Sequence, residues 1–376
     1  MNKFAENCRI SLTTRMAELA AEYRRADRPV IDLTAGEPDF PAHPDIGAAA
    51  VAFLQKHPIR YSCNQGLLEL RQLISRKIFK ENGIQYGADE ILVTHGAKQA
   101  VSNAIRALVN PGDEVIIFSP YYPSYLEMIR LSGGVPLIVP SLQMGENCPD
   151  FEFLNKKMNS NVSAMILNTP SNPAGVIFND AVLKKLAEFA EKHDLTVISD
   201  EIYSRIIYGN IPFRSFPSLS EDARSRTVLV NGFSKAFAMT GWRIGYAAAS
   251  NDIIRVMSCI HNQTTGNVSL VSQSAAMAAC RLDEKFTQDM LEEWEHRLMT
   301  VMRLFDKIGI DYIRPNGAIY IFFKFPLSAN EILKKTGLAL VPGEAFGMTG
   351  YCRMALTSPV TDLIRACARL DQLMKK

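Results

Sequence analysis

Short apolar runs alternate with segments of helical periodicity along most of the chain. The apolar runs predict strands at 91–94, 115–118, 135–139, 164–167, 196–199 and 228–230. Segments in which apolar and charged positions recur at helical spacing predict helices at 11–26, 45–55, 67–82 and 183–193, and others after residues 96 and 124. Strands that are apolar throughout are typical of a sheet buried on both faces. We therefore expect an α/β fold with a mostly parallel central sheet covered by helices on both faces.

The pattern changes after about residue 285. A long charged segment at 284–307 predicts a helix, short strands follow at 312–313, 319–325, 339–341 and 353–356, and a last helix starts at residue 360. We expect these elements to form a smaller α+β domain, joined by the N-terminal segment. A chain of 376 residues commonly folds as two domains. We predict a large domain at 45–285 and a small domain made of 1–44 and 286–376.

The charges are close to balance, with 41 Lys and Arg residues, 39 Asp and Glu residues and a formal net charge of +2. This balance argues against binding to nucleic acid or to a membrane surface through bulk electrostatics. The sequence has no apolar run long enough to span a bilayer, and its first residues lack the apolar core of a secretory signal. We expect a cytoplasmic protein with neither a nucleic-acid nor a membrane partner.

The cysteines and histidines carry no metal-binding motif. The seven cysteines are scattered without a C-x-x-C pair, and the six histidines form no H-E-x-x-H motif. An odd number of scattered cysteines is typical of reduced thiols in a reducing compartment. We expect no metal centre.

Polar and aromatic residues follow five of the predicted strands. They are Gly96-Ala97-Lys98, Tyr121-Tyr122, Asn172, Asp200 with Tyr203, and Ser234-Lys235. In open α/β sheets, ligands bind at the carboxyl ends of the strands. The agreement of five strands therefore predicts one binding site along this edge.

Two of these positions carry a physical argument of their own. Asp200 follows four uncharged strand residues, where a carboxylate is costly to bury without a cationic partner, although a helix cap or loop edge is the alternative. Glu201 beside it lacks this rationale. Lys98 lies at the start of a predicted helix, where backbone N–H groups favour a phosphate and a cation is unfavourable unless an anion is near. A solvated lysine is the alternative there.

The motif GFSK at 232–235, followed by GWRIG at 241–245, resembles that of the class I and II aminotransferases. The resemblance extends from LTAGEPDF at 33–40 to YCRM at 351–354 and is strongest toward the bacterial and archaeal aspartate aminotransferases. It implies a fold type I enzyme that uses pyridoxal phosphate and moves an amino group between an L-amino acid and a 2-oxo acid. It also implies a homodimer with shared active sites.

The resemblance further implies which residues hold the cofactor, with Lys235, Asp200 and Tyr203 as the catalytic set. Lys235 would form the Schiff base and then transfer protons, which suits a lysine whose pKa falls on burial. Asp200 would hold the proton on the pyridine nitrogen, which makes the ring a better electron sink. The other residues implied are Asn172 and Tyr203 at the phenolic oxygen, Tyr122 on the ring, and Ser234, Arg243, Gly96, Ala97 and Lys98 around the phosphate. We expect Arg243 to lie on the strand after Lys235.

Other residues are implied for the subunit contact and the substrate. Tyr61 matches a tyrosine that reaches the phosphate of the neighbouring subunit. Arg353 and Gly36 would bind the α-carboxylate of the substrate, with Tyr122 and Asn172 also facing it. Alternation along 351–356 places Arg353 on the less apolar face of its strand, where it can point into an interdomain cleft.

The substrate itself stays open at this point. A lysine at the place of Lys98 binds the distal carboxylate of the substrate in the similar aspartate aminotransferases, which favours aspartate or glutamate as donor and 2-oxoglutarate as acceptor. Tyr122 stands where the family usually has tryptophan, and its smaller ring can change the reaction or the substrate preference. Aromatic, alanine and prephenate-type substrates remain open. β-Elimination from a cysteine conjugate shares the first proton abstraction and also remains possible.

Two other classes of protein fit the sequence less well than an aminotransferase. A non-catalytic sensor domain that binds pyridoxal phosphate would carry an appended DNA-binding domain, whereas this sequence begins with the enzyme-like segment. A nicotinamide dehydrogenase is excluded because no predicted strand is followed by G-x-G-x-x-G.

Overall fold

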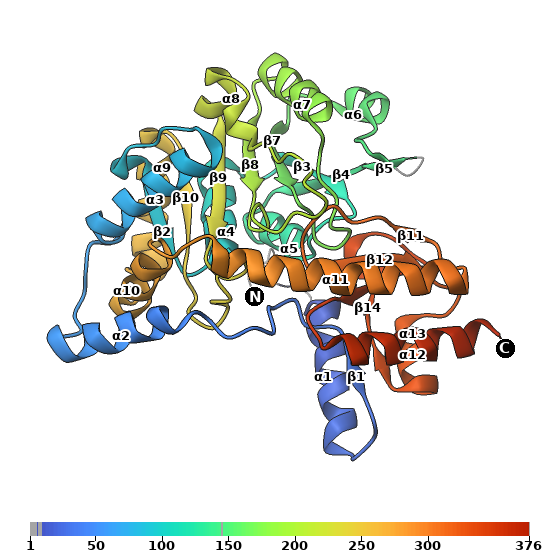
Figure 1. Cartoon of the computed structure of the whole chain (residues 1–376). Helices are drawn as coiled ribbons and strands as arrows, with labels where there is room; N and C mark the ends of the chain where they lie inside the picture. The colour runs from blue at the N-terminus through green and yellow to red at the C-terminus, as the bar shows by residue number, and fades with distance from the viewer. Residues whose placement is uncertain (1–5, 7–9, 144–145, 376) are drawn as a thin grey trace.

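The computed structural model describes residues 6, 10–143 and 146–375. Its largest element is a seven-stranded sheet in the order β2-β10-β9-β8-β7-β3-β4 (Figure 1). The strands are β2 (Ile91–Thr94), β3 (Glu114–Ser119), β4 (Val135–Pro140), β7 (Val162–Asn168), β8 (Thr196–Asp200), β9 (Thr227–Gly232) and β10 (Gly245–Ala248). Only β10 runs antiparallel to its neighbours. The mostly parallel sheet expected from the sequence is confirmed.

Helices cover both faces of this sheet. Leu92 of β2 packs in one apolar cluster with α4, α5 and α9, whereas Ile91 and Val93 pack in another with α2, α3 and α10. Alternate residues of a strand point to opposite faces, so the two clusters lie on opposite sides. The helices of this part are α2 (Pro44–Lys56), α3 (Leu68–Asn82), α4 (Ala97–Leu108), α5 (Ser124–Leu131), α6 (Phe151–Lys157), α7 (Asp180–Lys192), α8 (Glu221–Ser225), α9 (Asn251–Thr264) and α10 (Leu270–Ala279).

A second sheet is built by the C-terminal quarter of the chain. Its antiparallel strands lie in the order β11 (Tyr312–Ile313), β12 (Tyr320–Lys324), β15 (Tyr351–Ala355) and β14 (Val341–Pro342). A separate parallel pair joins β1 (Ile31–Asp32) to β13 (Leu338–Ala339), which ties the N-terminal segment to this part. The domain boundaries at 45 and 285 remain a prediction.

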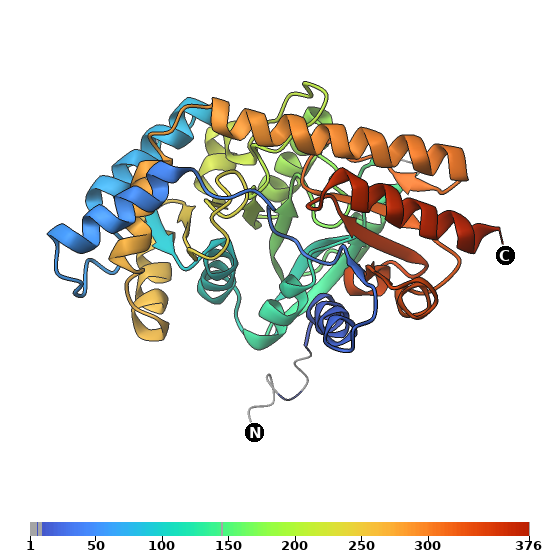
Figure 2. The same cartoon turned by 60° about the horizontal axis from the view of Figure 1, so that its bottom comes forward.

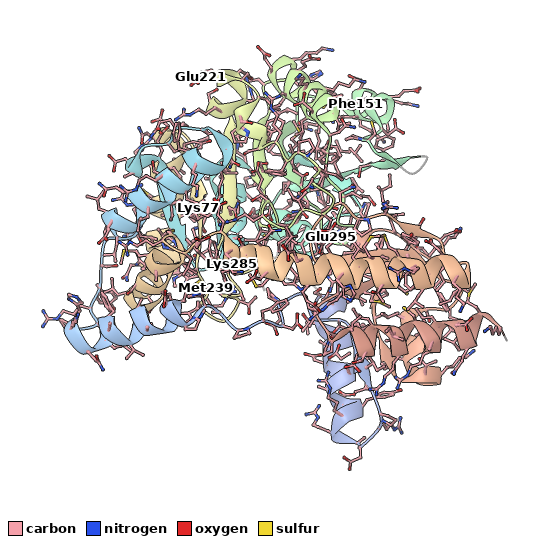
Figure 3. All side chains as sticks on the ribbon, viewed as in Figure 1. Lys77, Phe151, Glu221, Met239, Lys285 and Glu295 are labelled. Atoms are coloured by element: carbon pink, nitrogen blue, oxygen red, sulfur yellow. The ribbon has the colours of Figure 1, made fainter. Side chains whose placement is uncertain are left out.

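The helices α1 (Leu12–Arg25), α11 (Lys285–Ile308), α12 (Ala329–Thr336) and α13 (Val360–Met374) pack around the second sheet. α11 begins at Lys285 beside the first part and runs through Glu295 toward the second sheet (Figure 3). Its buried residues Trp294, Leu298 and Phe305 recur at helical spacing and form one apolar stripe. The stripe explains why so charged a segment folds as one long helix.

The remaining elements are short. They are β5 (Leu142–Gln143), β6 (Glu146–Asn147), η1 (Ala88–Glu90), η2 (Phe216–Ser218) and η3 (Gly343–Phe346). None of the helices in the described part of the chain is both long and apolar enough to cross a membrane.

The segment at 33–43, which we call the strap, leads from β1 to α2. It crosses from the elements around the second sheet to the helices of the seven-stranded sheet (Figure 2). Arg297 of α11 holds it, because its guanidinium lies 2.9 Å from each carboxylate oxygen of Asp39 and 5.4 Å from the ring centre of Phe40. Arg297 is buried, and charge-assisted hydrogen bonds of this kind are strong. The strap is therefore fixed at one end to α11.

Candidate active site

A cavity of about 520 Å³ lies where the carboxyl ends of the central strands meet the strap and the second sheet. Pockets that bind small molecules usually have this size. The sequence-predicted residues that line it are Gly36, Ala97, Lys98, Tyr122, Asn172, Asp200, Tyr203, Ser234, Lys235, Arg243 and Arg353. Residues that are far apart in the sequence thus share one site.

Two predicted residues do not line the cavity. Gly96 precedes α4 with a φ of 80°, and a Cβ there would come within 2.8 Å of a guanidinium nitrogen of Arg243. Glycine therefore leaves room for the arginine. Tyr61 lies in the loop between α2 and α3 and is 99% exposed.

Lys235 follows β9 and points its amine into the cavity. Nζ donates a hydrogen bond to the carbonyl oxygen of Gly36 in the strap and lies 5.9 Å from the ring centre of Tyr203. Burial, together with the cations of Arg353 and Arg243, lowers the pKa of Lys235 to about 8, and the carboxylates of Glu37 and Asp200 oppose this shift. About a tenth of this amine is therefore neutral at pH 7.

Asp200 ends β8 and is 6% exposed. Its Oδ2 accepts a hydrogen bond from the hydroxyl of Tyr125 at 2.7 Å, and its Oδ1 accepts one from the backbone N–H of Ile202 at 3.3 Å. Burial raises the pKa of Asp200 to about 6. Within the described residues this carboxylate forms no ion pair with lysine or arginine, so a cation bound beside it would be stabilised.

Tyr125 was missed by the sequence analysis. It lies in the first turn of α5, whereas Tyr122 precedes the helix, and the two rings meet edge to face at 5.4 Å. Its backbone N–H donates to the carbonyl oxygen of Tyr122 at 3.1 Å, so the turn before the helix brings the two tyrosines together.

Basic side chains gather at the start of α4. Arg243 lines the cavity with Lys98, whose Nζ lies 5.7 Å from the ring centre of Tyr122. Across the described chain, neither cation has a carboxylate within ion-pair distance. The N–H groups at a helix start and two such cations favour an anion.

One expectation about Arg243 is wrong. It does not lie on a strand but in the turn before β10, with a φ of 52°. Its Nη1 donates to the backbone oxygen of Thr240 at 2.8 Å, which holds the turn. A positive φ is uncommon outside glycine, and strain of this kind is found at functional sites.

Arg353 lies on β15 and is 2% exposed. Its Nη1 donates to Oδ1 of Asn172 at 2.9 Å and its Nη2 to the backbone oxygen of Thr34 at 2.7 Å, whereas its buried Nε has no partner. As predicted from alternation, Arg353 lies on the same face of β15 as Tyr351 and Ala355, and it lines the cavity. Residues 352–355 are all buried, so packing covers both faces of the strand.

Glu201, which the sequence analysis set aside, is fully buried but lies outside the cavity lining. Its Oε1 accepts hydrogen bonds from the hydroxyls of Ser199 and Ser215 and from the backbone N–H of Phe216. Burial raises the pKa of Glu201 to about 7. The carboxyl group fixes the loop before η2 to the end of β8.

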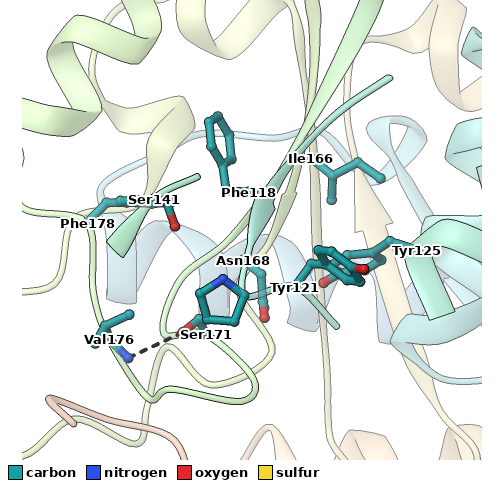
Figure 4. Close-up of a pocket in the computed structure, with 10 residues that line it drawn as sticks. Phe118, Tyr121, Tyr125, Ser141, Ile166, Asn168, Ser171, Val176 and Phe178 are labelled. Carbon is teal, nitrogen blue, oxygen red and sulfur yellow. Dashed lines mark hydrogen bonds between the residues drawn. The ribbon is translucent and has the colours of Figure 1, made fainter. Parts of the chain in front are cut away.

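A much smaller cavity of about 20 Å³ lies behind the site, lined by Tyr121, Tyr125, Asn168 and Ser171 among others (Figure 4). It has room for about one water molecule and not for a substrate. Asn168 lines both cavities, and it bonds the backbone of Asp200 at 3.1 Å and the backbone N–H of Asn172 at 2.8 Å. Asn168 therefore sets the relative position of two predicted site residues.

The family described as aminotransferase class I and II matches residues 28–370. The chain belongs to the class I and II aminotransferases. This aminotransferase is 35% identical to the aspartate aminotransferase of Thermotoga maritima over 369 residues, covering 97% of each chain. It is 34% identical to the aspartate/prephenate aminotransferase of Thermus thermophilus over 373 residues, covering 97% of this chain and 96% of the other.

Solved structures agree with these relatives. The crystal structure of the Thermotoga maritima aspartate aminotransferase aligns with a TM-score of 0.95 at 34% identity over 100% of both chains. That of the Thermus thermophilus aspartate aminotransferase with maleate aligns with a TM-score of 0.95 at 33% identity over 99% of both chains. The aminotransferase has the fold type I architecture and depends on pyridoxal phosphate.

Proposed function

We propose that this aminotransferase uses aspartate or glutamate as amino donor and 2-oxoglutarate as acceptor. The observation that carries the proposal is that two cations in the lining of one cavity, Lys98 on α4 and Arg353 on β15, form no ion pair with any carboxylate of the described residues. A dicarboxylic substrate has an anion for each of them. The names of the similar aspartate and aspartate/prephenate aminotransferases support the same substrate class.

The donor groups of the cavity fit pyridoxal phosphate. Asp200 is a buried carboxylate that has no ion-pair partner among the residues described, which suits a protonated pyridine nitrogen. The start of α4 with Ser234 and Arg243 suits a phosphate. We assign the backbone of Gly96 and Ala97 to the phosphate as well, and Lys98 to the distal carboxylate of the substrate. The remaining contacts proposed are Asn172 and Tyr203 at the phenolic oxygen, Tyr122 on the ring, and Lys235 as the amine that holds the aldehyde. When bound, this cofactor supplies an aldehyde and an electron-accepting ring.

Lys235 would carry the proton transfers. Because its pKa is about 8, its amine would take the proton from the α-carbon of the amino donor and, in the reverse direction, would deliver a proton to the α-carbon of the 2-oxo acid acceptor. Arg353 would hold the α-carboxylate, since its buried Nε is free to donate, and the backbone of Gly36 adjoins the same space.

β-Elimination shares the first proton transfer, and the accumulation of pyruvate and ammonia instead of a new amino acid would reveal it.

Because the pKa of Lys235 is lowered, the rate at which the apoprotein binds pyridoxal phosphate should depend on pH. The neutral amine attacks the aldehyde, so the rate constant should rise about tenfold per pH unit below pH 8 and level off above it. Stopped-flow absorbance of the apoprotein mixed with pyridoxal phosphate measures this rate, with N-acetyl-lysine methyl ester as the solvated reference. A rate that kept rising to pH 10, as for the reference amine, would contradict an amine with a pKa near 8.

Substrate choice is tested through Lys98. Lys98→Ala should lower kcat/KM for aspartate about 30-fold through loss of a charge-assisted hydrogen bond, and leave that for alanine within about twofold. A donor panel of aspartate, glutamate, alanine and phenylalanine measures both values, and Lys98→Arg serves as the control that keeps the charge. If the ratio of kcat/KM for aspartate to kcat/KM for alanine is the same in Lys98→Ala as in the parent enzyme, the acidic-substrate proposal is refuted.

We propose that the enzyme is a cytoplasmic homodimer with shared active sites. The exposed Tyr61 is accompanied on α2 and its neighbouring segments by exposed apolar side chains, namely Val51, Leu54, Ile59 and Leu68. A patch of this kind marks protein contacts, and Tyr61 would reach the phosphate of a second copy. Exposed free thiols at Cys63 and Cys259 suit a reducing compartment.

A further inference from the structure

Tyr320 lines the cavity from β12 and is 1% exposed. Its ring faces Arg353, whose guanidinium carbon lies 4.3 Å from the ring centre. The ring of Phe346 lies 5.2 Å from the same carbon. A guanidinium plane is attracted to an aromatic face, so these two rings limit the orientations open to Arg353.

The hydroxyl of Tyr320 contacts a different residue, Tyr203. It lies 2.8 Å from the hydroxyl of Tyr203, and the two rings meet edge to face at 5.9 Å. It also touches the strap, because a Cβ at Gly36 would overlap it. Burial raises the pKa of both tyrosines, so both hydroxyls keep their protons.

The direction of this hydrogen bond follows from the number of protons. Each hydroxyl has one hydrogen to donate and can also accept. If Tyr203 gives its hydrogen to the phenolic oxygen, the bond between the tyrosines must be donated by Tyr320. A donor that itself accepts a hydrogen bond becomes a stronger donor.

We propose that Tyr320 is a positioning residue with two separable actions: its ring orients the guanidinium of Arg353, and its hydroxyl donates to Tyr203. This inference rests on the proposed roles of Arg353 and Tyr203. It links the group that binds the substrate carboxylate to the group that contacts the cofactor, through one side chain of the second sheet.

Two substitutions separate the actions. Tyr320→Phe removes only the hydroxyl, whereas Tyr320→Leu removes the ring as well. Phe346→Leu is the matched control, because it removes the opposite ring from Arg353 and leaves the Tyr203 hydrogen bond intact. The holoenzymes are compared by the pH midpoint of their near-visible absorbance change and by their Kd for maleate, a dicarboxylate that cannot react.

The expected pattern differs for each variant. Tyr320→Phe moves the absorbance midpoint to higher pH by about 0.5 unit, because a weaker donor at Tyr203 leaves more negative charge on the phenolic oxygen to hold the titrating proton. Its maleate Kd changes by less than about twofold, because the ring remains. Tyr320→Leu shows the same shift and binds maleate about tenfold more weakly. Phe346→Leu weakens the binding of maleate without moving the pH midpoint of the absorbance change.

The other titratable and charged residues that face Tyr203 are unchanged in Tyr320→Phe. They are Lys235, Tyr122, Tyr125 and Arg353. A midpoint in Tyr320→Phe equal to that of the parent enzyme overturns the hydroxyl action, and maleate binding in Tyr320→Leu equal to that in Tyr320→Phe overturns the ring action. Circular dichroism and Tm confirm folding, and if Tyr320→Leu does not fold, Tyr320→Met is substituted. A parent enzyme that neither transaminates nor shows the absorbance change refutes the proposed function instead.

Discussion

Lys235→Ala should lose the near-visible absorbance of the bound cofactor and about 10⁴-fold in kcat for transamination. The loss is this large because one amine both holds the aldehyde and moves the α-proton, and a positioned acid–base group contributes up to that factor. Its partial neutrality, set by a pKa of about 8, fits it for both tasks. Absorbance spectra and a coupled assay for the 2-oxo acid product measure the two losses.

Lys235→Arg is the matched control for charge. Arginine keeps the cation beside Asp200, but its pKa is too high for it to act as an amine base, so it should be as inactive as alanine. Lys334→Ala, at an exposed position of α12, should retain parent activity. Turnover and absorbance that survive in Lys235→Ala would show that another residue holds the cofactor.

Asp200→Asn should lower kcat by about 10³-fold while KM for the donor changes by less than threefold, because a preorganised charge that acts in the transition state is lost. The folded pKa of about 6 means that Asp200 is mostly ionised at pH 7, and a cation bound beside it lowers that pKa further. Asparagine keeps the shape and removes the charge. Steady-state kinetics at pH 7 separate kcat from KM.

Tyr125→Phe provides the graded comparison for Asp200. It removes the 2.7 Å hydrogen bond to Oδ2 and leaves the carboxylate in place. The hydrogen bond stabilises the charged form, so its loss raises the pKa of Asp200, and activity on the acid side should decline at a higher pH than in the parent enzyme. Equal kcat values in the parent enzyme and Asp200→Asn would exclude the electron-sink role.

The sequence predicted the central architecture because its strands are apolar throughout and five of them are followed by polar or aromatic residues that mark one edge of the sheet. That reasoning brought Asp200, Asn172 and Lys235 to one edge, and these residues do line one cavity. It could not predict that β10 is antiparallel, because an antiparallel strand buried on both faces has the same apolar pattern as a parallel one.

Arg353 and Tyr320 show what only the tertiary structure decided. The sequence places an arginine and a tyrosine on two short strands of the second sheet, and alternation assigns the face of Arg353 but neither its burial nor its partners. Whether a strand has one covered face or two depends on segments distant in sequence, here the strap and the loop that carries Asn172.

By itself, the sequence determined the chemistry available to this protein: a lysine after an apolar strand, a carboxylate without a nearby cation, and cations at a helix start. The tertiary structure alone decided the pKa values of these groups. Burial and neighbouring charges set the pKa of Lys235 near 8 and that of Asp200 near 6. Both depend on how much water the packed chain excludes, and no local pattern of residues encodes that quantity.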